Sequence, residues 1–380
     1  MKLTIKHLGT LCFSFLVFFT GVCERLVFAN ENDDIFENQE IAVSPSGALL
    51  AVNWLDSISI FDLNDGTELR TFDAQVDTPF VFSFNLDGSK LFVSGWEQNS
   101  VWQVATGKQL AKVKTNDNTN CGGFSENQKH LFFDDEFNQF GARQLVLSND
   151  RFKKKKLVVK NSANCRVSPD NKFLALQTYS LSDNGFSVED TQLQVIDLNA
   201  GKIISTLTGE GTDVYDEDMF FFDGNTKLLV RDSSDYYIWD IQQGKVIESW
   251  DSELYANEIA FTGSRLLLTA DNEKRVFDLL AEATPTVAID LPENHNSVLD
   301  ANLSSDGKHY VITSYHDERE SDVVVSLFET EGDVLKHRVE TQASIYGAQF
   351  AKDDSLLVFE SYPIVVVDVE TGNVLYEIKQ

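Results

Sequence analysis

An internal repeat of about 44 residues constrains the fold of this chain more than any other feature. Copies run from about residue 41 to the end, and two clear ones are IAVSPSGALLAVNWLDSISIFDLNDGTELRTF and GAQFAKDDSLLVFESYPIVVVDVETGNVLYEI. The turn after the first strand of each copy recurs eight times, near Gly47, Gly88, Gln128, Asn171, Thr226, Ser264, Gly307 and Asp354. One such unit is too small to bury its apolar residues alone, so neighbouring units must stack.

Each unit reads as four short strands separated by turn residues. The first turn has sequences such as Ser-Pro-Ser-Gly and Ser-Ser-Asp-Gly, which favour tight turns. The third turn carries a glycine in six units, at Gly66, Gly107, Gly201, Gly244, Gly332 and Gly372. Long amphipathic helical patterns are missing from the repeat region, so the sequence predicts an all-β fold.

This repeat resembles the WD40-like and YVTN-type β-propellers of bacteria over roughly residues 41–380. The resemblance implies four-stranded blades, and the eight units predict eight blades. Seven blades is the alternative, if the irregular third or sixth unit is not a full blade. Each unit runs from its inner to its outer strand, so ring closure is expected without a shared blade. The Gly-His dipeptide of true WD40 repeats is absent, and the repeat says nothing of function.

The N-terminal residues 1–29 have the pattern of a signal peptide. Lys2 and Lys6 precede an apolar run from Leu8 to Val22, and cleavage is expected after Ala29. Cleavage after Cys23, or retention of the segment as an anchor, is the alternative. Residues 30–40 form an acidic lead-in, and residues 41–380 form the propeller. We therefore expect a monomeric periplasmic or secreted protein that is not inserted in a membrane after signal cleavage.

The charge balance is strongly acidic. The chain has 31 Lys and Arg against 60 Asp and Glu, which gives a formal net charge of -29. Such a charge repels the phosphates of nucleic acids, so no nucleic acid partner is expected. The basic run of Arg151 and Lys153–Lys156 is an exception. It either protects an exposed outer strand against edge pairing or docks an acidic partner.

Two cysteines, Cys121 and Cys165, lie after the predicted cleavage site. Each precedes the serine of the first-turn motif in consecutive units, so both belong near inner strands that converge at the centre. In an oxidising compartment the pair would form a disulfide. The alternative is two separate buried thiols.

The loops between the second and third strands share one face of a propeller, and they carry aromatic and acidic residues. Exposed aromatic side chains beside charges are typical of binding anchors. The sequence therefore predicts a partner-binding face that includes Trp54, Trp96, Asp134, Glu136, Tyr179, Asp216, Tyr315 and Tyr362. The alternative is that the aromatics cap the packing of the blades and the acids keep the rim soluble.

The sequence contains none of the motifs that mark a catalytic site. We find no nucleophile elbow, no HExxH and no phosphate loop, and no histidine has metal-ligand spacing to another His or Cys. We expect no catalytic residues, no metal and no cofactor, and predict a non-catalytic module that binds another protein.

Two other functions compete with protein binding. One is a lactonase-like or hydrolytic enzyme with a divalent cation in the central channel, held by Asp213 or Asp216. The other is a small-molecule or glycan binder with Trp54 and Trp96 as stacking platforms.

Overall fold

The computed structural model describes residues 40–379 with short gaps, and the chain divides into two compact units, Met1–Glu37 and Asn38–Gln380. All described residues belong to the second unit. The gaps are residues 55–56, 74–80, 96–97, 116–118, 137–142, 150, 154, 182–187, 210, 215–217, 233–234, 252–257, 271–272, 280–286, 289–290, 293–294, 296, 317–318 and 342–344. The predicted signal peptide and the predicted lead-in up to residue 39 therefore lie outside the described part of the chain. Within that part no helix is long and apolar enough to cross a bilayer.

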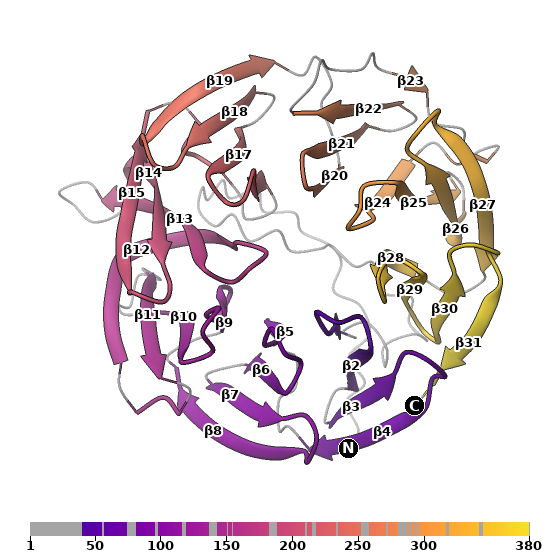
Figure 1. Cartoon of the computed structure of the whole chain (residues 1–380), viewed down its shortest axis with the longest axis horizontal. Coiled ribbons are helices and arrows are strands. Elements are labelled where there is room, and N and C mark those ends of the chain that lie inside the picture. The colour runs from indigo at the N-terminus through magenta and orange to yellow at the C-terminus, as the bar shows by residue number, and fades with distance from the viewer. Residues whose placement is uncertain are drawn as a thin grey trace, which may run out of the picture. The chain divides into compact units, whose positions relative to one another are not determined.

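The described residues form 31 antiparallel strands in seven sheets (Figure 1). The first two sheets are β1(Ile41–Val43) β2(Leu49–Trp54) β3(Ser57–Asp62) β4(Glu68–Asp73) and β5(Phe82–Phe84) β6(Lys90–Gly95) β7(Gln98–Gln103) β8(Lys108–Lys114). The third holds seven strands, β9(Gly122–Phe124) β10(His130–Glu136) β11(Arg143–Asn149) β12(Lys155–Val167) β13(Phe173–Leu181) β14(Val188–Asp197) β15(Lys202–Thr208).

Four further sheets have four strands each and follow in chain order. They are β16(Met219–Phe222) β17(Lys227–Asp232) β18(Asp235–Asp240) β19(Lys245–Asp251), then β20(Glu258–Thr262) β21(Arg265–Ala270) β22(Glu273–Asp278) β23(Val287–Ala288), then β24(Ser297–Leu303) β25(His309–His316) β26(Arg319–Glu329) β27(Val334–Thr341), and last β28(Ile345–Ala351) β29(Leu356–Ser361) β30(Ile364–Asp368) β31(Val374–Ile378). This is a β-propeller-like all-β fold.

The sheet count is seven because the third and fourth repeat units share one long strand. β12 pairs with β11 over Lys155–Ser162 and then with β13 over Ser162–Val167. Its 13 residues thus serve as the outer strand of one unit and the inner strand of the next. The sequence predicted separate strands here, and the structure joins them without a break.

Both faces of each sheet are buried, which explains the nearly continuous apolar strands. In β2, Leu50 and Val52 pack against the last sheet, whereas Ala51 between them packs against the second sheet. This alternation follows from the two-residue period of a strand. Among the described residues it produces eight apolar clusters, each lying between two consecutive repeat units.

The order of these clusters is cyclic, because one of them joins the first repeat unit to the last. It contains Leu50 of β2 together with Val358 of β29 and Val366 of β30. The Tyr376 hydroxyl of β31 also donates a hydrogen bond of 2.7 Å to the carbonyl oxygen of Leu63. The first and last sheets are each complete in themselves, so the ring closes by side-chain packing and not through a shared sheet.

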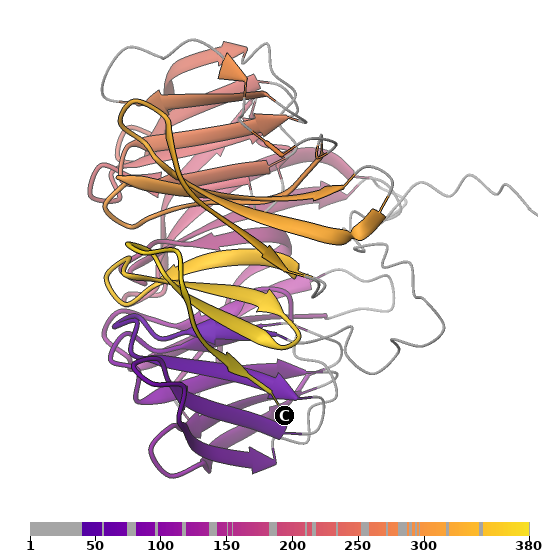
Figure 2. The same ribbon diagram turned by 90° about the vertical axis from the view of Figure 1, so that its right-hand side faces the viewer.

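The two ends of the sheets differ in the connections that they carry (Figure 2). We call one the turn end, since it holds the tight turns from first to second and from third to fourth strand, such as Ser44–Ala48 and Leu63–Thr67. The opposite end, where the second strand leads to the third, is the loop end. The described residues of the predicted binding face belong to the loop end, namely Trp54, Asp134, Tyr179, Tyr315, Tyr362 and the backbone of Glu136.

Aspartates stabilise the turn end by accepting backbone N–H groups. The amides of Ser89, Gln243 and Thr371 donate to Asp87, Asp240 and Asp368 over 2.7–2.9 Å. Side-chain hydrogen bonds from Ser89 and Thr371, followed by these backbone bonds, lower the pKa of Asp87 and Asp368, and the backbone bond from Gln243 lowers that of Asp240. Burial acts to raise the pKa of Asp306, but hydrogen bonds from Lys308 and Ser304 outweigh it and hold the pKa at about 2.

Glycine at the turn end is required where neighbouring turns approach closely. At Gly47, φ is +67°, and a Cβ atom there would lie 2.0 Å from the backbone nitrogen of Lys352 in the last sheet. Any other residue would therefore force apart the two turns that flank the closure of the ring.

Candidate functional site

The loop end of the seven-stranded sheet brings together two of the residues predicted for the binding face. Asp134 lies in β10 and Tyr179 lies near the end of β13, and both interact with Arg143 at the start of β11. Strand pairing explains why Arg143 lies close to Asp134 and Tyr179. In the register of the sheet, Arg143 is opposite Glu136 of β10 on one side and Ser162 of β12 on the other.

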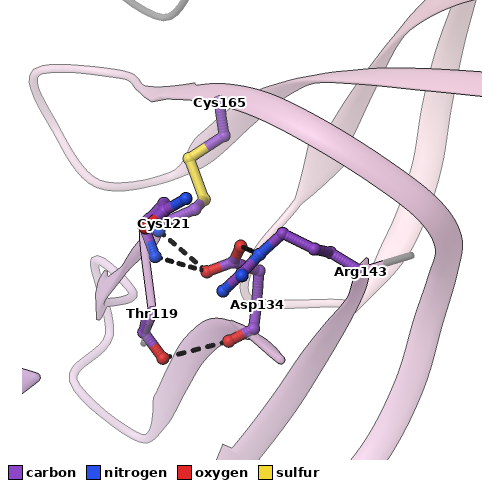
Figure 3. Close-up of a disulfide and its surroundings, with 6 residues drawn as sticks. Thr119, Cys121, Asp134, Arg143 and Cys165 are labelled. Atoms are coloured by element: carbon purple, nitrogen blue, oxygen red, sulfur yellow. Dashed lines mark hydrogen bonds and ion pairs between the residues drawn. A yellow bond between two sulfur atoms is a disulfide. The ribbon is translucent and has the colours of Figure 1, made fainter. Parts of the chain in front are cut away.

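Asp134 is completely buried, and its carboxylate is fully engaged (Figure 3). Oδ1 accepts the backbone N–H groups of Asn120 at 2.9 Å and Cys121 at 2.8 Å. Oδ2 accepts Nε–H of Arg143, whose side chain is 12% exposed. The carboxylate thus ties the start of β9 to the start of β11. The partners of this buried acid are therefore groups of the protein itself.

Burial also dominates the titration of this group of side chains. It raises the pKa of Asp134, while Arg143 and the two amides oppose the rise. It raises the pKa of the Tyr179 hydroxyl too, again against Arg143. With both polar ends committed to partners inside the protein, the Asp134–Arg143 pair is a structural anchor of the loop end.

A disulfide joins Cys121 to Cys165 directly beside this anchor (Figure 3). Of the two alternatives considered for these cysteines, the structure therefore contains the bonded pair. The Cα atoms are 6.0 Å apart, within the usual range for a disulfide. Cys121 immediately precedes β9 and Cys165 lies in β12, so the bond links the first strand of the third repeat unit to that of the fourth.

A second ion pair fixes the loop end of the next sheet. Nε of Arg231 in β17 donates to Oδ1 of Asp218 over 2.6 Å, and both side chains are largely buried. Tyr236 of β18 is stacked on Trp250 with ring centroids 5.4 Å apart, and burial raises its pKa to about 12. Two neighbouring sheets therefore hold their loop ends with an arginine and a buried aspartate.

Trp54 is not the exposed anchor that the sequence analysis expected. Its side chain is only 4% exposed and packs edge-on against Phe61 and Tyr362, with ring centroids 6.4 Å away in both cases. The reason is strand alternation, since Trp54 follows Leu50 and Val52 on the face of β2 that meets the last sheet. A stacking platform for a sugar at Trp54 is excluded by the same burial.

Three tyrosines of the predicted face keep part of their surface open to solvent. Tyr179, Tyr315 and Tyr362 are all partly exposed, and each stands at or just after the end of the second strand of its unit. Tyr315 rests on the apolar cluster between the last two sheets, and Tyr362 on the cluster that closes the ring.

The other predicted residues are described only in part or not at all. Trp96 and Asp216 lie outside the described residues, and for Glu136 only the backbone is described, at the end of β10. Asp213 is exposed and accepts a hydrogen bond of 3.2 Å from Gln177. In the part of the chain that the structure describes, no three His, Cys, Asp or Glu side chains are grouped as metal ligands would be, so Asp213 has no described co-ligands.

Arg143 and Arg231 were not among the residues predicted from the sequence, although these side chains organise the loop end. Each lies beside a loop at the end of a strand whose central residues are apolar, where a largely buried cation needs a carboxylate partner. The position of each arginine at a strand end could have indicated its role from the sequence, but this position does not identify the aspartate that pairs with the arginine.

Comparison with known proteins supports the fold alone. No protein-family model matches the chain, and no curated protein sequence is similar to it. A crystal structure of the eukaryotic initiation factor matches with a TM-score of 0.60 and 14% sequence identity, over 90% of this chain and 87% of that one. As many as 1555 chains of solved structures match, so the architecture is common and carries no function by itself.

Proposed function

We propose that this chain is an exported, non-catalytic propeller that binds another protein through its loop end. The observation that carries the proposal is the set of partly exposed tyrosines, Tyr179, Tyr315 and Tyr362, at equivalent strand ends of three repeat units. Tyrosine offers a large, rigid contact area and is enriched at the energetic centres of protein interfaces.

The interior of the sheets supports a binding role of this kind. The two arginine–aspartate pairs and the disulfide fix strand ends at the loop end before a partner arrives. A pre-organised surface loses less conformational entropy on binding, so a modest contact area gives useful affinity. We therefore treat Asp134 as a supporting residue of this face and the tyrosines as its contact residues.

Charge suggests the chemistry of the partner. The chain carries a net charge of -29, and Asp213, Asp235 and Asp251 are exposed at the loop end. Charge complementarity across an interface speeds association and rejects partners of like charge. A protein with a basic face is the partner that fits this surface.

The number of blades and the type of repeat are part of the same proposal. We infer eight blades of WD40-like or YVTN-type repeats, with β12 shared by the third and fourth blades. The support is the set of eight apolar clusters, one between each pair of consecutive units, although the sheets number seven. The disulfide supports export, because such bonds persist in oxidising compartments such as the periplasm or the extracellular medium.

The test is crosslinked capture from the native envelope or secretion fraction. The tagged protein and a Tyr315→Ser/Tyr362→Ser variant are compared, since these two tyrosines belong to consecutive repeat units. We expect a specific partner with the unmodified protein and its loss with the variant. Leu110→Ser, an exposed apolar residue on outer strand β8, is the matched control.

The fold of each variant is checked by circular dichroism and its melting temperature. Equal capture by the unmodified protein and the double variant would contradict the proposal. Absence of any specific partner in all samples would contradict it as well. Partner loss with Leu110→Ser alone would move the interface to the outer strands.

A further inference from the structure

A cavity of about 220 Å³ lies at the turn end, between the third and fourth repeat units. The third unit contributes His130 of β10, Leu147, Ser148 and Asn149 of β11, and Lys156 of β12, while the fourth contributes the turn Asn199–Gly201. This site is formed by the same strands as the Arg143 anchor, but at their opposite ends.

Strand geometry decides which side chains face the cavity. Phe132 and Leu147 pack toward the fourth unit, and His130 stands two residues before Phe132 on the same face of β10. Lys156 is directly opposite Leu147 in the register of β11 and β12, so it shares that face. The cavity thus has an imidazole and an ammonium group on the sheet side, above an apolar floor.

The charge of the lining is the reverse of the charge of the whole chain. Among the described residues that line the cavity there is no carboxylate, although Asp and Glu number 60 in this protein. The basic run of the sequence analysis belongs to an acid-free stretch, residues 151–169, which holds Arg151, Lys153, Lys154, Lys155, Lys156, Lys160 and Arg166. The described lining of this cavity therefore favours a negatively charged ligand.

Lys156 is held in place but keeps hydrogen-bonding capacity. Its Nζ donates a bond of 2.6 Å to the carbonyl oxygen of Gly201, which fixes the ammonium at the wall of the cavity. An ammonium group has three N–H donors, so two are left for a ligand. Nδ1 of His130 is buried and has no partner among the described residues, so this imidazole also keeps hydrogen-bonding capacity.

We propose that this cavity binds a phosphate group, either as inorganic phosphate or as part of a small phosphate ester. A phosphate presents several acceptor oxygens and up to two negative charges, which match the lysine and histidine donors better than a single carboxylate does. The cavity is smaller than the roughly 300–1,000 Å³ typical of sites for drug-sized ligands, so the ligand is small.

Two described carboxylates, those of Glu126 and Asp197, accept hydrogen bonds from the turn that lines the cavity. Glu126 accepts the side-chain amide of Asn199 at 2.9 Å. Asp197 accepts the backbone N–H groups of Asn199 and Ala200 at 2.9 and 2.8 Å. These bonds shape the turn that forms one wall of the cavity, and they direct both carboxylates to donors within the protein. The proposal is independent of protein binding at the loop end.

Isothermal titration calorimetry of the purified protein at neutral pH and low ionic strength tests the proposal. The probes are inorganic phosphate and glycerol phosphate, with acetate as the carboxylate control. We expect both phosphates to bind, acetate to bind far more weakly, and affinity to fall as salt is added. Tighter binding of glycerol phosphate would show that the cavity also contacts the organic part, whereas equal affinity would assign recognition to the phosphate alone.

Lys156→Gln should weaken phosphate binding at least tenfold, while Lys112→Gln, which removes the same charge from β8, should leave it unchanged. His130→Gln supplies a second variant of the cavity and should weaken binding by a smaller factor. Circular dichroism shows whether each variant is folded. The proposal is wrong if millimolar phosphate produces no heat, if acetate binds as well as phosphate, or if Lys156→Gln and Lys112→Gln bind equally.

Discussion

The third repeat unit has a cation at each end of its strands, Arg143 at the start of β11 and Lys156 near the start of β12, and the surroundings of these two cations are opposite. At the loop end, Arg143 is nearly buried and paired with Asp134, whose remaining oxygen is occupied by two backbone amides. At the turn end, Lys156 is exposed beside a cavity whose described lining contains no carboxylate, and its Nζ donates a hydrogen bond to the carbonyl oxygen of Gly201.

The difference shows which kind of charge serves the fold and which is available for a ligand. Removing one member of a buried ion pair leaves the other uncompensated in a medium that solvates it poorly. An exposed cation is solvated by water whether or not a ligand is present, so its loss costs little stability. We therefore expect the loop end to determine stability and the turn end of these strands to tolerate substitution.

The largest effect is expected from Asp134→Ala. The substitution leaves Arg143 without its counter-charge and the amides of Asn120 and Cys121 without an acceptor, so the free energy of unfolding should fall by about 3–5 kcal/mol. Urea denaturation measures it. Asp235→Ala, an exposed aspartate at the same end, should cause no measurable change. Similar midpoints for the two variants would show that the anchor is unimportant.

Loss of the disulfide should have the next largest effect. Cys121→Ser/Cys165→Ser opens a link between residues 44 apart in sequence, and removing a link of this kind typically costs about 2–4 kcal/mol. The denaturation midpoint of the double variant should match that of the reduced unmodified protein. Equal midpoints for the oxidised and reduced protein would contradict this expectation.

A smaller, pH-dependent effect is expected at the turn end. The folded pKa of Asp306 is about 2, below its ordinary value of 3.8, so its stabilising contribution is present above the ordinary value and is lost as the pH falls through about 2. Asp306→Asn should make the decline in stability between these pH values shallower. Because the carboxyl is partly exposed, the change should stay below about 1 kcal/mol. An unchanged pH profile, followed by thermal unfolding, would argue against a role for this carboxylate.

The smallest effect on stability is expected from Lys156→Gln. The variant loses one hydrogen bond to Gly201 from an exposed side chain, so unfolding should change by no more than about 0.5 kcal/mol. The same variant should lose phosphate affinity, which separates a ligand-binding cation from a structural one. A loss of stability comparable to that of Asp134→Ala would remove the distinction between the two ends.

The repeat, the strands and the location of the turns could be predicted from the sequence, because each depends on local residue patterns. It also placed Cys121 and Cys165 near each other. The burial of Trp54 could have been inferred as well, since Leu50, Val52 and Trp54 alternate along one strand face. The pairing of Arg143 with Asp134 could not have been inferred from the sequence, because it depends on how the start of β9 approaches β10 and β11 in space.

The cavity was hidden from the sequence for a similar reason. Its lysine and histidine are 26 residues apart in the third repeat unit, and its opposite wall is a turn of the fourth. The basic run was visible, but the bulges between β11 and β12 determine which lysine faces the fourth unit. The shared strand β12 was equally unforeseen, because Asn161, Ser162 and Asn164, at the point where it passes from one partner strand to the other, are residues typical of a loop.

The most direct test of the account is the affinity of the captured partner, measured by titration against three forms of the purified protein. Lys156→Gln should bind the partner as the unmodified protein does, whereas Tyr315→Ser/Tyr362→Ser should bind at least tenfold more weakly. That result would assign protein recognition to the loop end and leave the turn end for the anion. Unchanged affinity in the tyrosine variant, or loss of affinity in Lys156→Gln, would contradict the division of the molecule into these two ends.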